Sequence, residues 1–317
     1  MKDTEVVYIG IDVSKGTLDV DAGDFGVAKI PNTPMEVRKA LEALTGKANA
    51  KSLQVCFEST GPYTGALVAE CQALGLPYSM LNPCKVRLFA LSVATAKTDA
   101  IDARLIRLYS ETKRPGPTLA PRKAIAELDR LVLAREAIMK GTVALRGVLE
   151  TLKGSAAAKP MERTIAFNTK KIADYDRLIA QAVSADAEAS GLVGALSAVK
   201  GIGTLSAAKL VAGMPELGRL GKRKAAALAG LAPRTRESGQ FKGKSRIGGG
   251  RWKVREALFM PATVAIRHNP EMKRLHGHLM AQGKPYMLAL TAVMRRLLCH
   301  LNSVARDYYA KRREVPA

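Results

Sequence analysis

The sequence has 317 residues, 47% of them hydrophobic, which is enough to form two or three domains with hydrophobic cores. Its 50 Lys and Arg residues outnumber its 28 Asp and Glu residues and give a formal net charge of +22. No apolar stretch reaches the roughly 18 residues of a membrane span, and the first residues are unlike a signal peptide. We therefore expect a cytoplasmic protein that makes no membrane contact. Cys56, Cys71, Cys84 and Cys299 have neither zinc-ligand spacing nor a disulfide-rich setting, so we expect reduced thiols in the core.

Residues 1–112 alternate strand-like and helix-like segments, as expected of an α/β domain. Apolar runs predict strands at residues 6–13, 17–21, 27–30, 53–57 and 78–81. Helical patterns follow Pro34 and span Thr64 to Leu74. The second and third strands suggest a hairpin that extends the sheet.

Two of these strands end at an acidic residue. Asp12 ends the first apolar run and Glu58 ends the fourth, so both carboxylates should lie at the ends of buried strands. Asp99 and Asp102 are three residues apart in a helical pattern, which places them on one helix face. Each acid alone is explained equally well as a turn residue, a surface acid or a favourable charge in a first helical turn. That explanation does not account for two apolar strands that both stop at a carboxylate.

Together the four carboxylates predict a metal site. Their oxygen atoms suit Mg²⁺ or Mn²⁺, and two such ions about 4 Å apart can hold the attacking and leaving oxygens of a phosphodiester. A mixed sheet with carboxylates on its central strands and on a following helix is the layout of RNase H-like nucleases, including Holliday-junction resolvases. By this analogy we expect an RNase H-like first domain.

A segment rich in proline and glycine, Lys113 to Pro121, follows the first part and marks a domain boundary. In the second part, residues 113–190, apolar residues recur every seven positions in two runs separated by a turn-like segment. Arg135 interrupts the first run. The runs are Leu131, Ile138, Leu145 and Leu152, then Ile165, Ile172 and Ile179. They predict a helical hairpin with a coiled-coil seam, although ordinary amphipathic helices packed on a core explain runs of this length nearly as well.

The third part, residues 191–317, begins with two helical patterns joined by Gly201-Ile202-Gly203, which is typical of a helix-hairpin-helix element. Such a tight turn brings backbone N–H groups and a helix N-terminus against a phosphate. An ordinary glycine-capped helix turn explains the local pattern equally well. We expect this part to be mainly α-helical.

Positive charge is concentrated beyond the first part. Residues 1–112 have a net charge of −1, whereas residues 113–317 have a net charge of +23. Between Arg219 and Arg255 there are twelve basic residues and one acid, Glu237, a density suited to neutralising phosphates. An anionic membrane would also attract this charge, but the basic residues are interleaved with Gly, Ser and Trp252 and form no amphipathic apolar face. Nucleic acid is therefore the expected partner. The expected binding residues are Lys200, Gly201, Gly203, Arg234, Arg236, Lys242, Lys244, Arg246, Arg251, Lys253 and Arg255.

Ser238 precedes a glycine in a segment crowded with Arg and Lys, which we expect to be a flexible loop. A hydroxyl there could meet a phosphate whose charge the cations offset. Most Ser-Gly pairs are simply turns, and local chemistry alone favours that explanation.

Eight short motifs recur together in one known group of proteins. They are Ile9–Lys15, Phe57–Tyr63, Lys97–Ala103, Gly201–Gly203, Gly230–Pro233, Glu237–Gly239, Arg246–Arg251 and Gly283–Pro285. With these motifs the chain resembles, nearly end to end, the DEDD-type insertion-sequence transposases of family 110, now known as bridge-RNA-guided recombinases, and is most similar to subgroup 1111. One departure is Glu237, where that subgroup is expected to have Asp.

The resemblance implies that Asp12, Glu58, Asp99 and Asp102 bind catalytic Mg²⁺ ions and that Ser238 is the nucleophile. It implies a bacterial mobile element that encodes a non-coding guide RNA, the bridge RNA, which pairs with donor and target DNA. It further implies a homotetramer, built as a dimer of dimers. Each active site would then combine the acidic domain of one protomer with the serine-bearing domain of another.

The expected activity is therefore DNA strand exchange through a covalent phosphoserine intermediate, without ATP. Other classes stay open. A resolvase-like nuclease would use the same acids with metal-activated water and form no serine adduct. An ATPase of the actin and sugar-kinase type also begins with a strand ending in Asp, but Val13-Ser14 replaces the usual glycine and the basic half has no place there. A non-catalytic nucleic-acid-binding protein would have no use for the acidic cluster.

Overall fold

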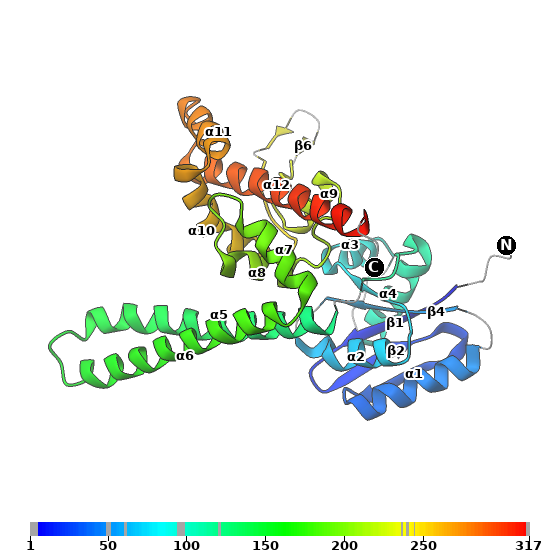
Figure 1. Cartoon of the computed structure of the whole chain (residues 1–317). Coiled ribbons are helices and arrows are strands. Elements are labelled where there is room, and N and C mark those ends of the chain that lie inside the picture. Colours follow the sequence, from blue (N-terminus) through cyan, green and yellow to red (C-terminus); the bar gives the residue numbers. More distant parts are fainter. Residues whose placement is uncertain are drawn as a thin grey trace. The chain divides into compact units, whose positions relative to one another are not determined.

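The structure is a computed structural model that describes residues 6–48, 52–59, 62–93, 99–119, 122–235, 237–238, 241–243 and 245–314. The chain divides into two compact units, and the boundary lies between Ala120 and Pro121. Figure 1 labels the α-helices and several of the strands of both units. The predicted segment rich in proline and glycine contains this boundary.

Within the described residues, the first unit is built on a five-stranded mixed sheet. Its strands are β1 (Val6–Val13), β2 (Thr17–Asp21), β3 (Val27–Pro31), β4 (Ser52–Glu58) and β5 (Tyr78–Leu81). They are ordered β3-β2-β1-β4-β5, with β2 antiparallel to both of its neighbours and β4 parallel to β1 and β5. The predicted strands and the predicted hairpin extension are confirmed.

Helices cover both faces of this sheet. Side chains alternate between the faces along each strand, and Ile11 and Phe57 face the helices α1 (Pro34–Ala48) and α2 (Gly65–Ala73). Cys56 on the opposite face packs with Val86 of α3 (Pro83–Val93) and Ile106 of α4 (Asp99–Lys113). The domain is therefore an α/β domain of three layers. Sequence reasoning predicted the helices after Pro34 and from Thr64, but it missed α3.

The segment that follows α4 is fixed to the edge of the sheet. The Thr118 backbone N–H donates to Tyr78 O at 2.7 Å, and the buried Gln54 side chain donates to Pro115 O at 2.6 Å. Ser79 Oγ donates to Gly116 O at 2.8 Å. The segment is non-helical, as predicted, but it belongs to the first unit.

The second unit begins with the long helical hairpin seen in Figure 1, formed by α5 (Lys123–Thr151) and α6 (Ala158–Ser184). The predicted hairpin is confirmed, and every residue of the two predicted runs is buried or half-buried. Arg135 lies in the seam with only 6% of its surface exposed. Its Nε donates to Asp176 Oδ1 of α6 at 2.6 Å, so the residue that interrupts the apolar run forms an ion pair across the hairpin.

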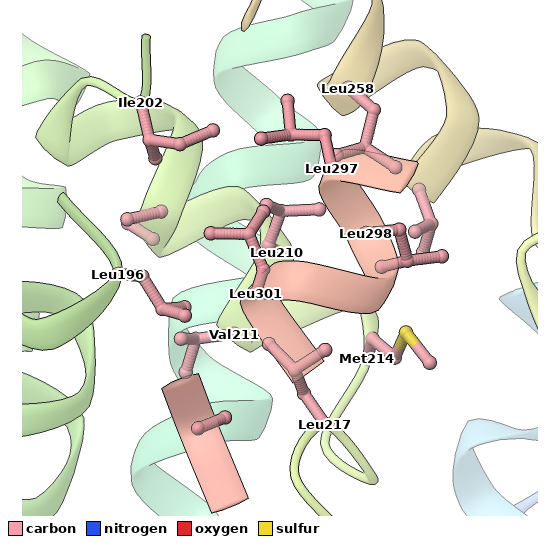
Figure 2. Packing of buried hydrophobic residues seen from close by; sticks show 14 of the residues in the cluster. Leu196, Ile202, Leu210, Val211, Met214, Leu217, Leu258, Leu297, Leu298 and Leu301 are labelled. Atoms are coloured by element: carbon pink, nitrogen blue, oxygen red, sulfur yellow. The ribbon is translucent and has the colours of Figure 1, made fainter. Parts of the chain in front are cut away.

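The remaining helices form one core with the base of the hairpin. They are α7 (Ala187–Ser197), α8 (Thr204–Gly213), α9 (Lys222–Leu228), α10 (Trp252–His268), α11 (Pro270–Ala281) and α12 (Tyr286–Glu314). Figure 2 shows Leu297, Leu298 and Leu301 of α12 packed among Leu210 of α8 and Leu258 of α10. The mainly helical third part is confirmed, and in the structure it shares a compact unit with the hairpin.

No helix in the described part of the chain is long and apolar enough to cross a membrane. All four cysteines are free thiols, as expected. Cys56 and Cys71 are buried, but Cys84 is exposed and Cys299 is half-buried. The prediction that all four lie in the core was therefore wrong for these two, because their helices α3 and α12 place them towards solvent.

Candidate active site

Asp12 and Glu58 lie side by side near the C-terminal ends of β1 and β4, two neighbouring inner strands of the sheet. Strands β1 and β4 are parallel, with Ile11 opposite Phe57, and the two acids are the next residues along their strands. Both acids are half-buried. Because side chains alternate, Asp12 shares its face with Gly10, and Glu58 shares the same face with Cys56.

That face is the one covered by α4, and Gly10 permits the close approach. A Cβ at Gly10 would collide with the Ala103 carbonyl oxygen and lie 2.5 Å from Arg107 N. Helix and strand are therefore packed backbone to backbone at this point. No larger residue fits there without moving α4 away from the sheet.

The direction of α4 places its first residues beside the two strand-end acids. Ala103 and Arg107 lie over Gly10, and the chain beyond the end of α4 reaches Gln54, four residues before Glu58 on β4. The helix thus runs antiparallel to β1 and β4. Its N-terminal turn, with Asp99 and the half-buried Asp102, lies at the end of the face where Asp12 and Glu58 lie.

Arg107 fixes this helix to the sheet from the side. Its Nε donates to Oδ1 of the buried Asp21 at 2.7 Å, and its Nη1 donates to Glu111 Oε1 at 2.5 Å. Burial opposes the charged form, but these two hydrogen bonds and charges outweigh it and raise the pKa of Arg107. Because Asp21 is opposite Gly10 in the β1–β2 pair, the ion pair and the glycine contact hold α4 at the same level.

The side chains whose positions are described include no group of three His, Cys, Asp or Glu residues that could hold a metal ion. Asp99 begins α4, but its side chain is outside the described part, so the predicted four-carboxylate set is incomplete there. The donors that are placed are carboxylates on neighbouring elements, which is the oxygen chemistry that Mg²⁺ and Mn²⁺ prefer.

Ser238 lies in the second unit, on a short β-hairpin. It belongs to β6 (Glu237–Ser238), which pairs antiparallel with β7 (Phe241–Lys242), and Ser238 is opposite Phe241. Nearer the base, Arg234 and Arg246 form a backbone bridge with N–O distances of 2.9 and 3.1 Å. The described part of the predicted flexible loop is thus hydrogen-bonded, and we call residues 229–250 the serine hairpin.

The serine hairpin begins at Ala229 and ends at Gly250, and we call these two ends its feet. Hydrogen bonds hold the feet together. Arg251 N donates to Leu228 O at 2.7 Å, and Arg255 Nη1 donates to Ala229 O at 3.2 Å and also to Gly249 O. Gly249 and Gly250 have φ angles of 61° and 63°, in the left-handed region that favours glycine. A Cβ at Gly250 would also lie 2.5 Å from Leu228 O. Gly250 is therefore required both by its φ and by this close contact, and Gly249 by its φ.

Arg251 is part of a second contact at the same place. Its Nη1 and Nη2 donate to the two carboxylate oxygens of Glu216 at 2.7 and 2.6 Å, and Nη1 also donates to Gly213 O at 3.1 Å. Sequence reasoning missed Glu216 and the glycine contacts. The family-like motifs around Gly230 and Gly249 were visible, but nothing in them indicated a partner near residue 216.

The other predicted nucleic-acid-binding residues are distributed over the second unit. Lys200, Arg234, Arg246 and Lys253 are exposed. Gly203 is the N-cap of α8, as a helix-hairpin-helix turn requires. Gly201 has a φ of 103° and contacts Ala265 of α10, which gives it a packing role. The backbone of Lys242 is in β7. Arg236 and Lys244 are outside the described residues.

The acids and Ser238 thus lie on separate units of one chain, each in a region that matches a known family. Residues 9–153 match a model described as a transposase, of the DEDD type found in IS110 elements. Residues 193–277, which include the serine hairpin, match the model described as "Transposase IS116/IS110/IS902 family". None of the curated proteins compared with the chain matches it.

These two matches define a DNA transposase, an enzyme that recombines DNA. The chain belongs to the IS110 family of DEDD transposases. Divalent metal is typical of such enzymes, and DNA is their substrate.

Proposed function

We propose that this transposase is an RNA-guided recombinase that exchanges DNA strands through a phosphoserine intermediate. In this proposal Asp12, Glu58, Asp99 and Asp102 hold Mg²⁺ in an RNase H-like domain, and Ser238 is the nucleophile. The observation that carries the proposal is the arrangement of the acids. Asp12, the penultimate residue of β1, and Glu58, the last residue of the adjacent parallel strand β4, lie on the sheet face that α4 covers, and α4 begins at Asp99 and includes Asp102.

The proposed chemistry conserves the phosphodiester energy. Ser238 Oγ attacks the scissile phosphorus, an Oγ–P bond forms, and a deoxyribose oxygen leaves with a proton while the serine proton passes to water. A hydroxyl of another DNA end then attacks the phosphoserine, the Oγ–P bond breaks, and the serine regains a proton. Bound Mg²⁺ supplies charge neutralisation at the phosphate and at the leaving oxygen. No ATP is consumed.

A guide RNA and an oligomer complete the proposal. The basic residues of the second unit would bind the backbones of a bridge RNA and of donor and target DNA, while base pairing selects the sequence. The acids and Ser238 belong to different compact units, and the resemblance to the family favours an active site assembled from two protomers of a tetramer. The similarity to subgroup 1111 and a bacterial cytoplasmic location belong to the same proposal.

The acids are tested by removing one charge at a time. Asp12→Asn, Glu58→Gln, Asp99→Asn and Asp102→Asn should each lower strand cleavage at least about 100-fold, because metal neutralisation of the phosphate is worth several kcal/mol. Nucleic-acid affinity should change little. Glu42→Gln, an equal charge change at an exposed position of α1, is the control. Full cleavage by two of the four variants at saturating Mg²⁺ would rule out the four-carboxylate site.

The nucleophile and the shared site are tested together. Ser238→Ala and Asp12→Ala should each abolish a covalent protein–DNA adduct, and differently tagged chains co-expressed as mixed oligomers should regain it on the Asp12→Ala chain. Cleavage without any adduct would instead indicate a nuclease that uses activated water. No recovery in mixed oligomers that demonstrably form would place the site within one chain.

A further inference from the structure

We propose that Arg251, Glu216 and Arg255 position the serine hairpin, and that the two arginines act through protein contacts rather than through phosphate. The proposal rests on the proposed role of Ser238. It reassigns two of the residues expected to bind nucleic acid. Three observations carry it: the Arg251–Glu216 ion pair, the contacts of Arg255 with both feet of the hairpin, and the anchoring of Glu216 to the core.

The guanidinium group of Arg251 is hydrogen-bonded to acceptors within the protein. Its two terminal nitrogens bind both oxygens of Glu216 in a bidentate pair, and one of them also binds Gly213 O. Such a fork fixes orientation as well as distance. Because the Arg251 N–H simultaneously binds Leu228 O, this single residue holds the end of the serine hairpin against its beginning.

Arg255, one turn further along α10, joins the same two feet. Its Nη1 donates to the carbonyl oxygen of Ala229, where the chain enters the serine hairpin, and to that of Gly249, where the chain leaves it. Both acceptors are backbone atoms, so the contact depends on the path of the chain and not on any side chain of the hairpin. A guanidinium with these acceptors closes the base of the hairpin.

Glu216 is itself held by the core of the unit. It lies in the segment between α8 and α9, where Gly218 N donates to Oδ1 of Asn302 at 2.9 Å and Asn302 Nδ2 donates to Leu220 O at 2.8 Å. Asn302 is on α12 and is 0% exposed. A continuous series of contacts therefore connects the buried centre of α12 to the base of the serine hairpin.

The serine hairpin needs this support because its two strands are short. Strands of two residues, β6 and β7, give little stability of their own, since even longer isolated hairpins are marginal in water. Displacement of a reacting group by about 1 Å can cost about 100-fold in rate. Loosening the feet should therefore slow attack by Ser238 while leaving the exposed cations free to bind nucleic acid.

The test compares Glu216→Ala and Arg251→Lys with a matched control in the full-length protein. Glu216→Ala removes a negative charge and leaves every basic residue in place, and Arg251→Lys keeps the positive charge but cannot form the fork. Glu271→Ala is the control, because Glu271 also pairs with an arginine, Arg296 at 2.6 Å, on α11 and α12. Three quantities are measured: amide hydrogen exchange, the DNA dissociation constant, and the rate of adduct formation at saturating DNA.

Both test variants should speed exchange of the Arg234 and Arg246 amides, which bond across the hairpin base, and leave the amides of buried α12 residues unchanged. Adduct formation at saturating DNA should fall about 10- to 100-fold, with the dissociation constant within about twofold of wild type. Glu271→Ala should change none of the three. Arg255→Lys should behave like the test variants.

Protected Arg234 and Arg246 amides in both variants would overturn the proposal. So would weaker DNA binding by Arg251→Lys with an unchanged saturated rate, because that result identifies a phosphate contact. The two proposals fail separately. A wild-type protein that forms no Ser238 adduct contradicts the phosphoserine mechanism, while the exchange of the two amides still decides whether these residues hold the hairpin.

Discussion

Gly10 is the residue at which α4 comes closest to the sheet, and its size can be tested directly. In Gly10→Ala the added methyl group would collide with the Ala103 carbonyl, so α4 must move away from β1. We expect a loss of about 1–3 kcal/mol in the free energy of unfolding, as for other overpacked sites. Strand cleavage should fall as well, because the shift separates Asp102 from Asp12. Urea unfolding and a cleavage assay measure the two effects.

Gly16→Ala provides the control for this variant. Gly16 follows the same strand, but a Cβ there has no atom within 4 Å. Its stability and cleavage should match those of the wild type. Wild-type behaviour of Gly10→Ala would contradict the backbone contact between β1 and α4.

Burial of two thiols makes stability depend on alkaline pH. Burial raises the pKa of Cys56 from 9.0 to about 11 and that of Cys71 to about 12. The folded thiols stay protonated while the unfolded ones ionise, so their contribution is complete below pH 9 and is lost as the pH rises through about 11 for Cys56 and about 12 for Cys71. For Cys56 alone, the loss between pH 8 and pH 10.5 should be about 2 kcal/mol.

This contribution is measured by urea unfolding at the two pH values. Cys56→Ala should show a smaller decrease than the wild type, whereas Cys84→Ala, at an exposed position, should show the same decrease. Parallel pH dependence in all three proteins would show that the Cys56 thiol has no raised pKa.

At the scale of single residues, composition identified basic side chains but not their partners. Arg251 and Arg255 were assigned to nucleic acid because they lie in a strongly basic segment. In the structure their guanidinium groups bond within the protein, and Glu216 is 35 residues from Arg251. No periodicity or local motif pairs residues at that separation. The positions of Asp12 and Glu58 near the ends of β1 and β4 were easier to predict, since each acid lies at the end of an apolar run.

Among the helices and strands, sequence reasoning succeeded where apolar residues mark buried positions and failed where apolar residues are exposed. Strands β1 and β4 are apolar runs because both sheet faces are covered. Helix α3 was missed because its apolar residues do not mark a buried face. Leu88 and Leu91 are 69% and 70% exposed, and Val86 is the one described residue of the helix that is fully buried.

The ion pair in the seam of the helical hairpin gives a prediction at this scale. Asp176→Ala leaves the buried Arg135 guanidinium without its bidentate partner and should cost about 1–3 kcal/mol, below the range for fully buried pairs because the Asp176 side chain is 42% exposed. Arg135→Met places an apolar side chain in the seam and should cost less. Chemical unfolding of the two variants measures the difference.

The order of the two effects is the decisive result. Equal losses, or a larger loss for Arg135→Met, would mean that the Arg135 side chain stabilises the hairpin through its own packing rather than by pairing with Asp176. Glu127→Ala is a control, because its pair with Arg130 is exposed and surface pairs contribute little.

For the whole molecule, the two compact units differ sharply in charge. Residues 1–120 have a net charge of +1, and residues 121–317 have a net charge of +21. A fragment of residues 121–317 should bind nucleic acid with an affinity that falls steeply with salt, since each neutralised phosphate releases a counterion. Residues 1–120 should bind weakly. Filter binding from about 50 to 200 mM salt measures both slopes.

Equal affinities of the two fragments, or a flat salt response of residues 121–317, would contradict this assignment. Each fragment has its own hydrophobic core, so circular dichroism should show both to be folded. At this scale a cluster of proline and glycine predicted a boundary after Thr112, and the two compact units divide after Ala120, within the same cluster. The sequence did not predict that the helical hairpin and the later helices share a core. That core includes both Leu128 of the hairpin and residues far along the chain, such as Leu196.

The seam of the helical hairpin has a further consequence, which concerns its reach. Because seam residues repeat every seven positions, seven residues are the smallest insertion or deletion per helix that keeps every later side chain on its own face. Removing residues 142–148 from α5 and 162–168 from α6 leaves the turn and the Arg135–Asp176 pair unchanged. Each such deletion shortens the helical hairpin by about 10 Å. The length of the helical hairpin can therefore be changed in discrete steps, without any change to the sheet that carries Asp12 and Glu58 or to the serine hairpin.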